Sequence, residues 1–163
     1  MIYDIAGASN SNAFCSVAYV TAYYASRNNT VWAGLDLEVQ EAAIVKATAY
    51  LDSKYRWRGY RVTSLQALSW PRSGVELDGF LLDASVVPVR IKDATAELAY
   101  RVATGTELVS DVKAGGSVVE QTVDVITTKY SERATSQTSY SYVEQLLAPL
   151  VGVSSNAIRL VRA

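Results

Sequence analysis

Apolar residues recur at the three- and four-residue spacing of an amphipathic α-helix in residues 37–55 of the sequence. Val39, Ala43 and Ala47 lie on one stripe, and Asp36, directly before the segment, is of a residue type that favours helix N-caps. An apolar stripe of this length must be buried against another element. The sequence therefore predicts one long helix of a compact helical bundle.

A second long helix is predicted for residues 89–105, where Ile91 and Leu98 belong to one apolar face. Pro88 precedes it, and the fixed φ of proline suits the first turn of a helix. Gly105 follows the last apolar position and is a typical C-terminal stop. Both ends of this helix are therefore marked in the sequence.

Shorter elements complete the predicted fold. Ser16 is a candidate N-cap for a helix that ends before Asn28, and a last helix is expected within residues 140–152. Residues 117–130 alternate valine with polar residues, which predicts one bent strand or a β-hairpin. Residues 64–87 contain turn signals and are expected to form a long connection, a kind of loop that is usually functional or contacts a partner.

The predicted fold class is mainly α with a small β element. We expect a compact bundle of three to four helices plus a β-hairpin or bent strand and an extended C-terminal tail. The length of 163 residues corresponds to about one domain. Residues 1–152 are assigned to a single helical domain with a β insertion near 117–130, and residues 153–163 to a C-terminal docking tail.

Composition indicates the kind of surface and the cellular environment to expect. Half of the residues are apolar or aromatic and 19% are charged, less than the quarter typical of soluble domains, which hints at surface reserved for other subunits. The single cysteine rules out an intramolecular disulfide and fits a reducing compartment. We recognise no signal peptide and no run of about 20 apolar residues, so we expect no membrane contact.

The sequence contains few of the residues and motifs that a catalytic mechanism needs. It contains no histidine, the commonest general base and zinc ligand, and Cys15 therefore lacks an activating partner. Ser110 and Lys113 match an S-x-x-K pattern whose companion elements are missing. No phosphate-binding glycine loop is present. We expect no enzyme activity, no catalytic residue, no cofactor and no metal site.

Positive charge is concentrated in residues 53–75, which contain five basic residues and no acid although the whole chain has a net charge of -1. Two interpretations remain open. Arginines beside aromatic rings suit a single-stranded nucleic acid, because rings stack on bases and guanidinium groups hold phosphates. The same residues suit the basic end of a helix followed by a strand, with Arg56, Arg58 and Tyr60 on one face and Trp57 on the other.

The order and spacing of four segments resemble the head-to-tail connector (adaptor) proteins of tailed bacteriophages, over about residues 14–152. The segments are "EAAIVKATAYLDSKYRWRGYRV", "QALSWPRSGVELDG", "VPVRIKDATAELAYRVATG" and "VVEQTVDVITTKYSE" with "VEQLLAPLVG". The resemblance implies a structural virion protein, a ring of probably twelve subunits beneath the portal that extends the DNA channel and docks the tail or stopper. Members of this group are also labelled DnaT-like single-stranded DNA-binding protein, which implies the alternative function of binding single strands in phage replication.

The connector resemblance also implies partners and a location. The partners are the portal protein, a tail or stopper protein, further copies of the chain and, without sequence specificity, packaged double-stranded DNA. The location is the head-tail interface of the virion, after synthesis in the bacterial host cytoplasm. The C-terminal segment commonly engages the portal in that family, so we expect portal docking by Ile158, Arg159, Leu160, Val161 and Arg162.

The basic segment supplies the remaining candidate residues. For contact with channel DNA or with a neighbouring subunit we select Lys54, Arg56, Arg58, Arg61, Trp70 and Arg72. An acidic neighbouring subunit is slightly favoured over DNA, because the rest of the chain is acidic. The rings of Tyr55, Trp57 and Tyr60 are expected mostly in packing within or between subunits.

Overall fold

The computed structural model describes residues 1–108, 120–123, 126–129 and 139–152. In these residues the elements follow in the order α1 (Val17–Ala25), a 3-10 turn (Trp32–Gly34), α2 (Leu37–Lys54), β1 (Tyr60–Arg61), β2 (Arg72–Ser73), β3 (Glu76–Leu77), β4 (Phe80–Leu81), α3 (Val89–Ala103), β5 (Glu120–Val123), β6 (Ile126–Lys129) and α4 (Ser141–Leu147). The predicted fold class, mainly α with a small β element, is confirmed.

The predicted helix ends have the expected hydrogen bonds at two places. The Ser16 hydroxyl accepts a hydrogen bond from the backbone N–H of Tyr19 and so caps α1. At the end of α3, Gly105 has a φ of 95°, and the N–H of Thr106 donates to the carbonyl of Arg101 at 2.8 Å. This is the Schellman arrangement, which needs a left-handed residue such as glycine after the helix.

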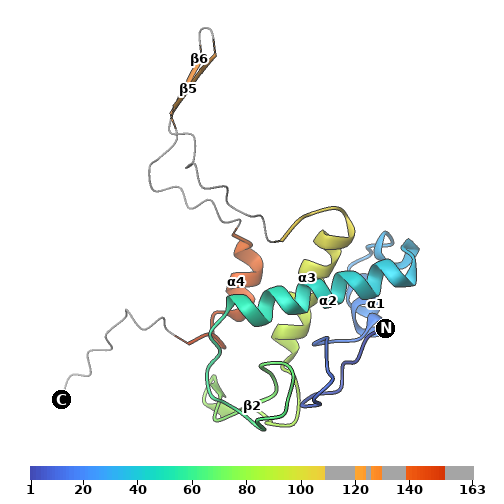
Figure 1. The fold of residues 1–163 in the computed structure, drawn as a ribbon, viewed down its shortest axis with the longest axis vertical. Coiled ribbons are helices and arrows are strands. Elements are labelled where there is room, and N and C mark those ends of the chain that lie inside the picture. The colour runs from blue at the N-terminus through green and yellow to red at the C-terminus, as the bar shows by residue number, and fades with distance from the viewer. Residues whose placement is uncertain (109–119, 124–125, 130–138, 153–163) are drawn as a thin grey trace, which may run out of the picture.

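Helix α3 lies at the centre of the bundle. It packs against α2, α4 and α1, and Figure 1 shows α2 crossing α3 with α4 beside them. The side chains of the hydrophobic core are almost completely shielded from water. The largest fully buried ones are Trp32, Trp70, Phe14, Ile44, Leu51, Ile91, Leu98, Leu147 and Leu150.

Two matched hydrogen bonds join α1 to α3. The Tyr19 hydroxyl donates to Asp93 at 2.7 Å, and the Tyr23 hydroxyl donates to Glu97 at 2.8 Å. Both pairs are spaced by four residues on their helices, so they lie one turn apart on facing surfaces. They fix the rotation of α1 against the central helix.

The apolar stripe of α2 begins later than predicted. Leu37 and Val39 are 60% and 42% exposed, whereas Ala43, Ile44, Ala47 and Leu51 are buried. A polar contact is made near this end of α2, where the amide nitrogen of the buried Gln40 donates to the carbonyl of Trp32 at 2.7 Å.

Residues 56–87 contain more β structure than the predicted long connection. β1 pairs with β2 and β3 pairs with β4, each pair antiparallel, at the lower end of the body in Figure 1. The predicted β element near 117–130 is a hairpin, in which β5 pairs with β6. The predicted helix within 140–152 is α4. The tail of residues 153–163 lies outside the described residues.

Candidate nucleic-acid interface

The backbone of Arg56–Arg58 is held in an extended conformation by the segment that follows α4. The N–H of Arg58 donates to the carbonyl of Leu150 at 2.9 Å, and the N–H of Gly152 donates to the carbonyl of Arg56 at 2.7 Å. Side chains of an extended chain alternate between its two faces. Trp57 therefore points inward, at 8% exposure and 5.8 Å from the ring of Trp70, while Arg56 and Arg58 are exposed.

A close backbone contact redirects the chain after Arg58. Gly59 has a φ of 70°, and a Cβ atom at this position would collide with the carbonyl oxygen of Ser73 and lie 2.6 Å from a methyl carbon of Val75. Only glycine combines this conformation with such a close approach. The turn brings Tyr60 opposite Ser73 and Arg61 opposite Arg72 in the β1–β2 pair.

The ring of Tyr60 projects into solvent. It is 78% exposed, and the arginines on either side of the Gly59–Tyr60 pair are exposed as well. We name Arg56, Arg58, Tyr60 and Arg61 the basic surface. None of its arginines takes part in an ion pair within the described residues, and the Arg61 guanidinium donates to the carbonyl of Ala67 at 3.3 Å.

Arg72 supports the basic surface from behind. Its guanidinium group donates to the carbonyls of Arg58 and Gly59, each at 2.6 Å, and of Ser69 at 3.2 Å. Burial and, to a smaller extent, the charge of Arg61 lower the pKa of Arg72, and the Asp52 carboxylate opposes this shift. Like charges on directly opposite strand positions repel each other. Arg61 and Arg72 therefore repel each other, and an anion bound beside them would reduce this repulsion.

The loop between β1 and β2 is organised by the buried side chain of Gln66. Its amide oxygen accepts hydrogen bonds from the N–H groups of Val62 and Thr63, and its amide nitrogen donates to the carbonyls of Leu68 and Pro71. The partners of all four hydrogen bonds belong to the loop between β1 and β2. Gln66 thereby fixes the ends of β1 and β2 and, with them, the position of Tyr60.

The structure separates the six candidate residues of the basic segment into two groups. Arg56, Arg58 and Arg61 are exposed and belong to the basic surface. Lys54 and Arg72 are half-buried and Trp70 is buried, and all three make contacts within the chain.

Lys54 and Trp70 are occupied by contacts within the chain. The ammonium group of Lys54 donates to the hydroxyl of Tyr50 at 2.8 Å and pairs with Glu144 at 3.4 Å. Burial alone would lower the pKa of Lys54, but the contacts with Tyr50, Tyr55 and Glu144 together raise it above its ordinary value. Trp70 is 1% exposed and belongs to the core, so neither DNA nor a neighbouring subunit reaches its ring.

The aromatic rings of the segment also differ from one another. Trp57 is buried and Tyr55 half-buried, as expected of packing residues, whereas Tyr60 is not packed within the chain. The candidate docking residues Ile158, Arg159, Leu160, Val161 and Arg162 lie outside the described residues. The segment that carries them begins after Gly152, whose N–H is bonded to Arg56.

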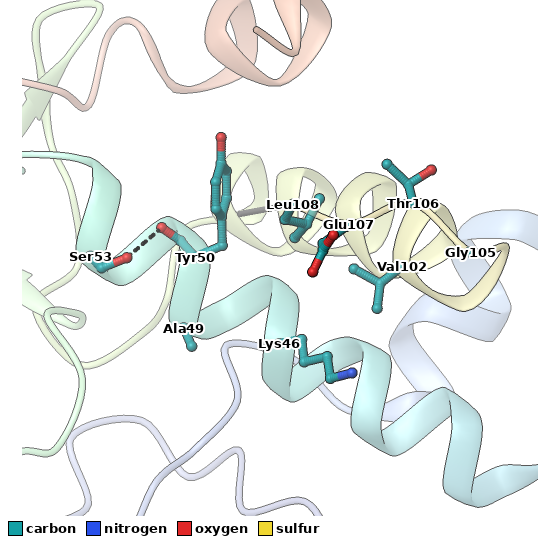
Figure 2. A pocket seen from close by; sticks show the side chains of 9 residues that line it. All are labelled: Lys46, Ala49, Tyr50, Ser53, Val102, Gly105, Thr106, Glu107 and Leu108. Carbon is teal, nitrogen blue, oxygen red and sulfur yellow. Dashed lines mark hydrogen bonds between the residues drawn. The ribbon is translucent and has the colours of Figure 1, made fainter. Parts of the chain in front are cut away.

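A cleft of about 670 Å³ lies away from the basic surface, between α2 and the C-terminal end of α3. Figure 2 shows Lys46 on the α2 side and Glu107 beyond the end of α3, with the ring of Tyr50 at one end. None of the candidate site residues lines it. Cys15 lies elsewhere and is buried, which raises the pKa of its thiol to about 12 and removes it as a nucleophile at neutral pH.

Two further properties of the described residues bear on function. They contain no group of three or more cysteine, aspartate or glutamate side chains placed to hold a metal ion. None of their helices combines the length and hydrophobicity that a membrane-crossing helix needs.

Sequence reasoning missed Gln66, which shapes this end of the molecule. Gln66 gives no signal, because a lone glutamine in a loop is an ordinary surface residue until its partners are known. The turn signals expected within residues 64–87 include Asp78–Gly79, and Asp-Gly between apolar residues is a strong hairpin signal. It marks the turn between β3 and β4, with φ values of 53° and 85°.

The comparison with known protein families identifies the family of the chain. A family model with the description "Putative DnaT-like ssDNA binding protein" matches residues 1–163, the whole chain. Neither the curated proteins nor the solved structures contain a significant match to the chain.

Proposed function

Because the chain belongs to the family of DnaT-like single-stranded DNA-binding proteins over its full length, we propose that it binds single-stranded DNA through the basic surface. The observation that carries the proposal is the exposed ring of Tyr60 in a short segment with the exposed arginines 56, 58 and 61, none of which forms an ion pair within the described residues. Proteins that bind single strands without sequence preference combine these two features, since bases stack on rings and phosphates pair with cations.

The electrostatics of the segment favour a phosphate chain. Residues 53–75 contain no acid, so no carboxylate of this segment repels a phosphate that approaches the arginines. The opposed Arg61 and Arg72 gain from an anion nearby. The contacts are sequence-independent, because phosphates and ring faces are common to every nucleotide.

Salt-dependent binding of a fluorescent oligo-dT measures the phosphate contacts. Each contact with a single strand adds about 0.7 to the negative slope of log K against log salt. The variant Arg56→Ala plus Arg58→Ala should therefore reduce the magnitude of the slope by about 1.4. The matched control is Lys46→Ala plus Arg101→Ala, which removes two charges from exposed positions elsewhere on α2 and α3. Equal slopes for wild type and the Arg56/Arg58 variant would refute the assignment.

The stacking role of Tyr60 has a separate test. Tyr60→Ala should remove the binding free energy of one stacked base, about 1–3 kcal/mol. This loss corresponds to a roughly 5- to 150-fold increase in the Kd for oligo-dT. Tyr142→Ala is the control, since Tyr142 is 48% exposed on α4 and lies outside the basic surface. If both tyrosine variants bind like wild type, Tyr60 is not a stacking platform.

A second candidate function is that of a virion head-to-tail adaptor without catalytic activity. Its support is the order and spacing of the segments quoted above and an exposed apolar hairpin, β3–β4, that suits contact between subunits. In that function the partners are the portal, a tail or stopper protein and further copies of the chain, at the head-tail interface of the virion. Negative-stain imaging of the chain mixed with its portal should show ring-capped portals. Persistent failure of the two to associate would exclude it.

A further inference from the structure

The β3–β4 hairpin (residues 76–81) exposes apolar side chains on both of its faces. Glu76 pairs with Leu81 and Leu77 pairs with Phe80, and paired residues share a face. Phe80 and Leu81 are neighbours on one strand and therefore point to opposite faces. Each is 76% exposed. An isolated two-stranded hairpin has little stability in water and is stabilised when its apolar side chains pack against another surface. The apolar side chains exposed on both faces therefore indicate a contact surface.

The base of the hairpin is anchored although its end is exposed. Val75 is 1% exposed and fits beside Gly59, and the N–H of Leu82 donates to its carbonyl at 2.8 Å. Phe80 and Leu81 thus project from a fixed base. A fixed, exposed apolar pair can bind a partner with little ordering of the chain.

The hairpin also carries negative charge. Glu76 and Asp78 are exposed, and neither forms an ion pair within the residues that the structure describes. Asp83, just beyond β4, accepts hydrogen bonds from Ser85, which lower the pKa of its carboxyl group. At neutral pH the hairpin therefore presents two apolar side chains among carboxylates.

The basic surface of the same chain is complementary to this hairpin. It offers three exposed arginines that have no acidic partner among the described residues, the exposed ring of Tyr60 and, shortly after β1, Leu65 at 79% exposure. The β1–β2 pair and the β3–β4 hairpin both lie at the lower end of the body in Figure 1. No ion pair joins them within the described part of one chain.

We propose that the β3–β4 hairpin is a self-association surface whose occupant is the basic surface of a second copy of this chain. The contact is reciprocal, since the hairpin of each copy meets the basic surface of the other, as in an isologous dimer. Glu76 and Asp78 face the partner's arginines, and the exposed apolar side chains are covered. Single-stranded DNA uses the same arginines, so DNA and the second copy exclude each other; only this competition rests on the proposed function.

Sedimentation velocity of the full chain without DNA tests the dimer. We expect a dimer whose fraction rises with protein concentration and falls when salt increases from about 0.1 M to about 1 M, which shortens the screening length from about 10 Å to about 3 Å. Phe80→Ser plus Leu81→Ser should leave only monomer. Val31→Ser plus Leu37→Ser removes exposed apolar groups elsewhere, at 52% and 60% exposure, and should dimerise like wild type.

Mixing two variants tests the pairing of the surfaces. Phe80→Ser plus Leu81→Ser retains the basic surface, and Arg56→Ala plus Arg58→Ala retains the hairpin, so each should be monomeric alone and the mixture should form a heterodimer with one contact. A wild type that stays monomeric at all concentrations overturns the proposal, as does a hairpin variant that dimerises like wild type. Circular dichroism of each variant verifies that it is folded.

Adding oligo-dT to the wild-type dimer separates this inference from the proposed function. Conversion of the dimer into a monomer bound to DNA supports both. A salt-sensitive dimer that binds no DNA refutes the proposed function and leaves the dimer standing. DNA binding by a protein that never dimerises refutes the dimer alone. A stable complex of the intact dimer with DNA on the arginines of the basic surface overturns the competition.

Discussion

Gly59 shows how one residue positions the basic surface. Its left-handed backbone and its contact with Ser73 and Val75 turn the chain between Arg58 and Tyr60. Any side chain at this position must displace the neighbouring strand or change the turn. The orientation of Tyr60 therefore depends on the absence of a Cβ atom one residue earlier.

We predict that Gly59→Ala destabilises the protein by more than the left-handed backbone conformation alone, which costs about 1–2 kcal/mol. Gly79→Ala is the matched control, because Gly79 also has a positive φ, of 85°, but no atom lies within 4 Å of the added Cβ. Denaturant unfolding of both variants gives the difference. Equal losses of unfolding free energy would show that the close approach to Ser73 is unimportant.

Arg72 and Arg58 look alike in the sequence but have different roles. Arg72→Ala removes three hydrogen bonds to backbone carbonyls and should lower the free energy of unfolding by about 1–3 kcal/mol. Arg58→Ala removes an exposed side chain and should change it by less than about 0.5 kcal/mol. Thermal and denaturant unfolding measure both. A neutral Arg72→Ala would contradict the supporting role of Arg72.

At the scale of elements, the sequence predicted helices well and short strands poorly. The helices α2 and α3 extend over several turns, and their periodicity agrees with their ends, where Asp36 and Pro88 hold the N-cap positions without a side-chain capping bond and Gly105 follows α3. The strands β1 to β4 have two residues each, too few to show an alternating pattern. Their geometry depends on Gly59 and Gln66, whose partners are distant or undetectable in the sequence.

The loop between β1 and β2 gives a prediction at this scale. Gln66→Leu keeps the size of the side chain but leaves the N–H groups of Val62 and Thr63 without their acceptor. Amide hydrogen exchange at these two residues should accelerate strongly, while α3 exchanges as in wild type. Unchanged protection of Val62 and Thr63 would mean that other groups hold the loop.

At the scale of the whole molecule, the sequence shows which segment carries the positive charge. It does not show which basic side chains of that segment are exposed. Charge and ring type indicate six candidate residues in the sequence. In the structure the exposed ones are Arg56, Arg58 and Arg61. Burial depends on packing between distant segments, such as Trp70 against Trp57 and Lys54 against Glu144. These contacts join parts of the chain that no local pattern relates.

The position of bound DNA tests the central claim most directly. A halogenated oligo-dT, cross-linked by ultraviolet light to the wild-type protein and mapped by peptide mass spectrometry, reports which side chains touch the bases. We predict cross-links at Tyr60, reduced in Tyr60→Ala and unchanged in Tyr142→Ala. Binding with cross-links confined to residues outside 55–75, or no binding in low salt, would contradict the proposal that the basic surface holds single-stranded DNA.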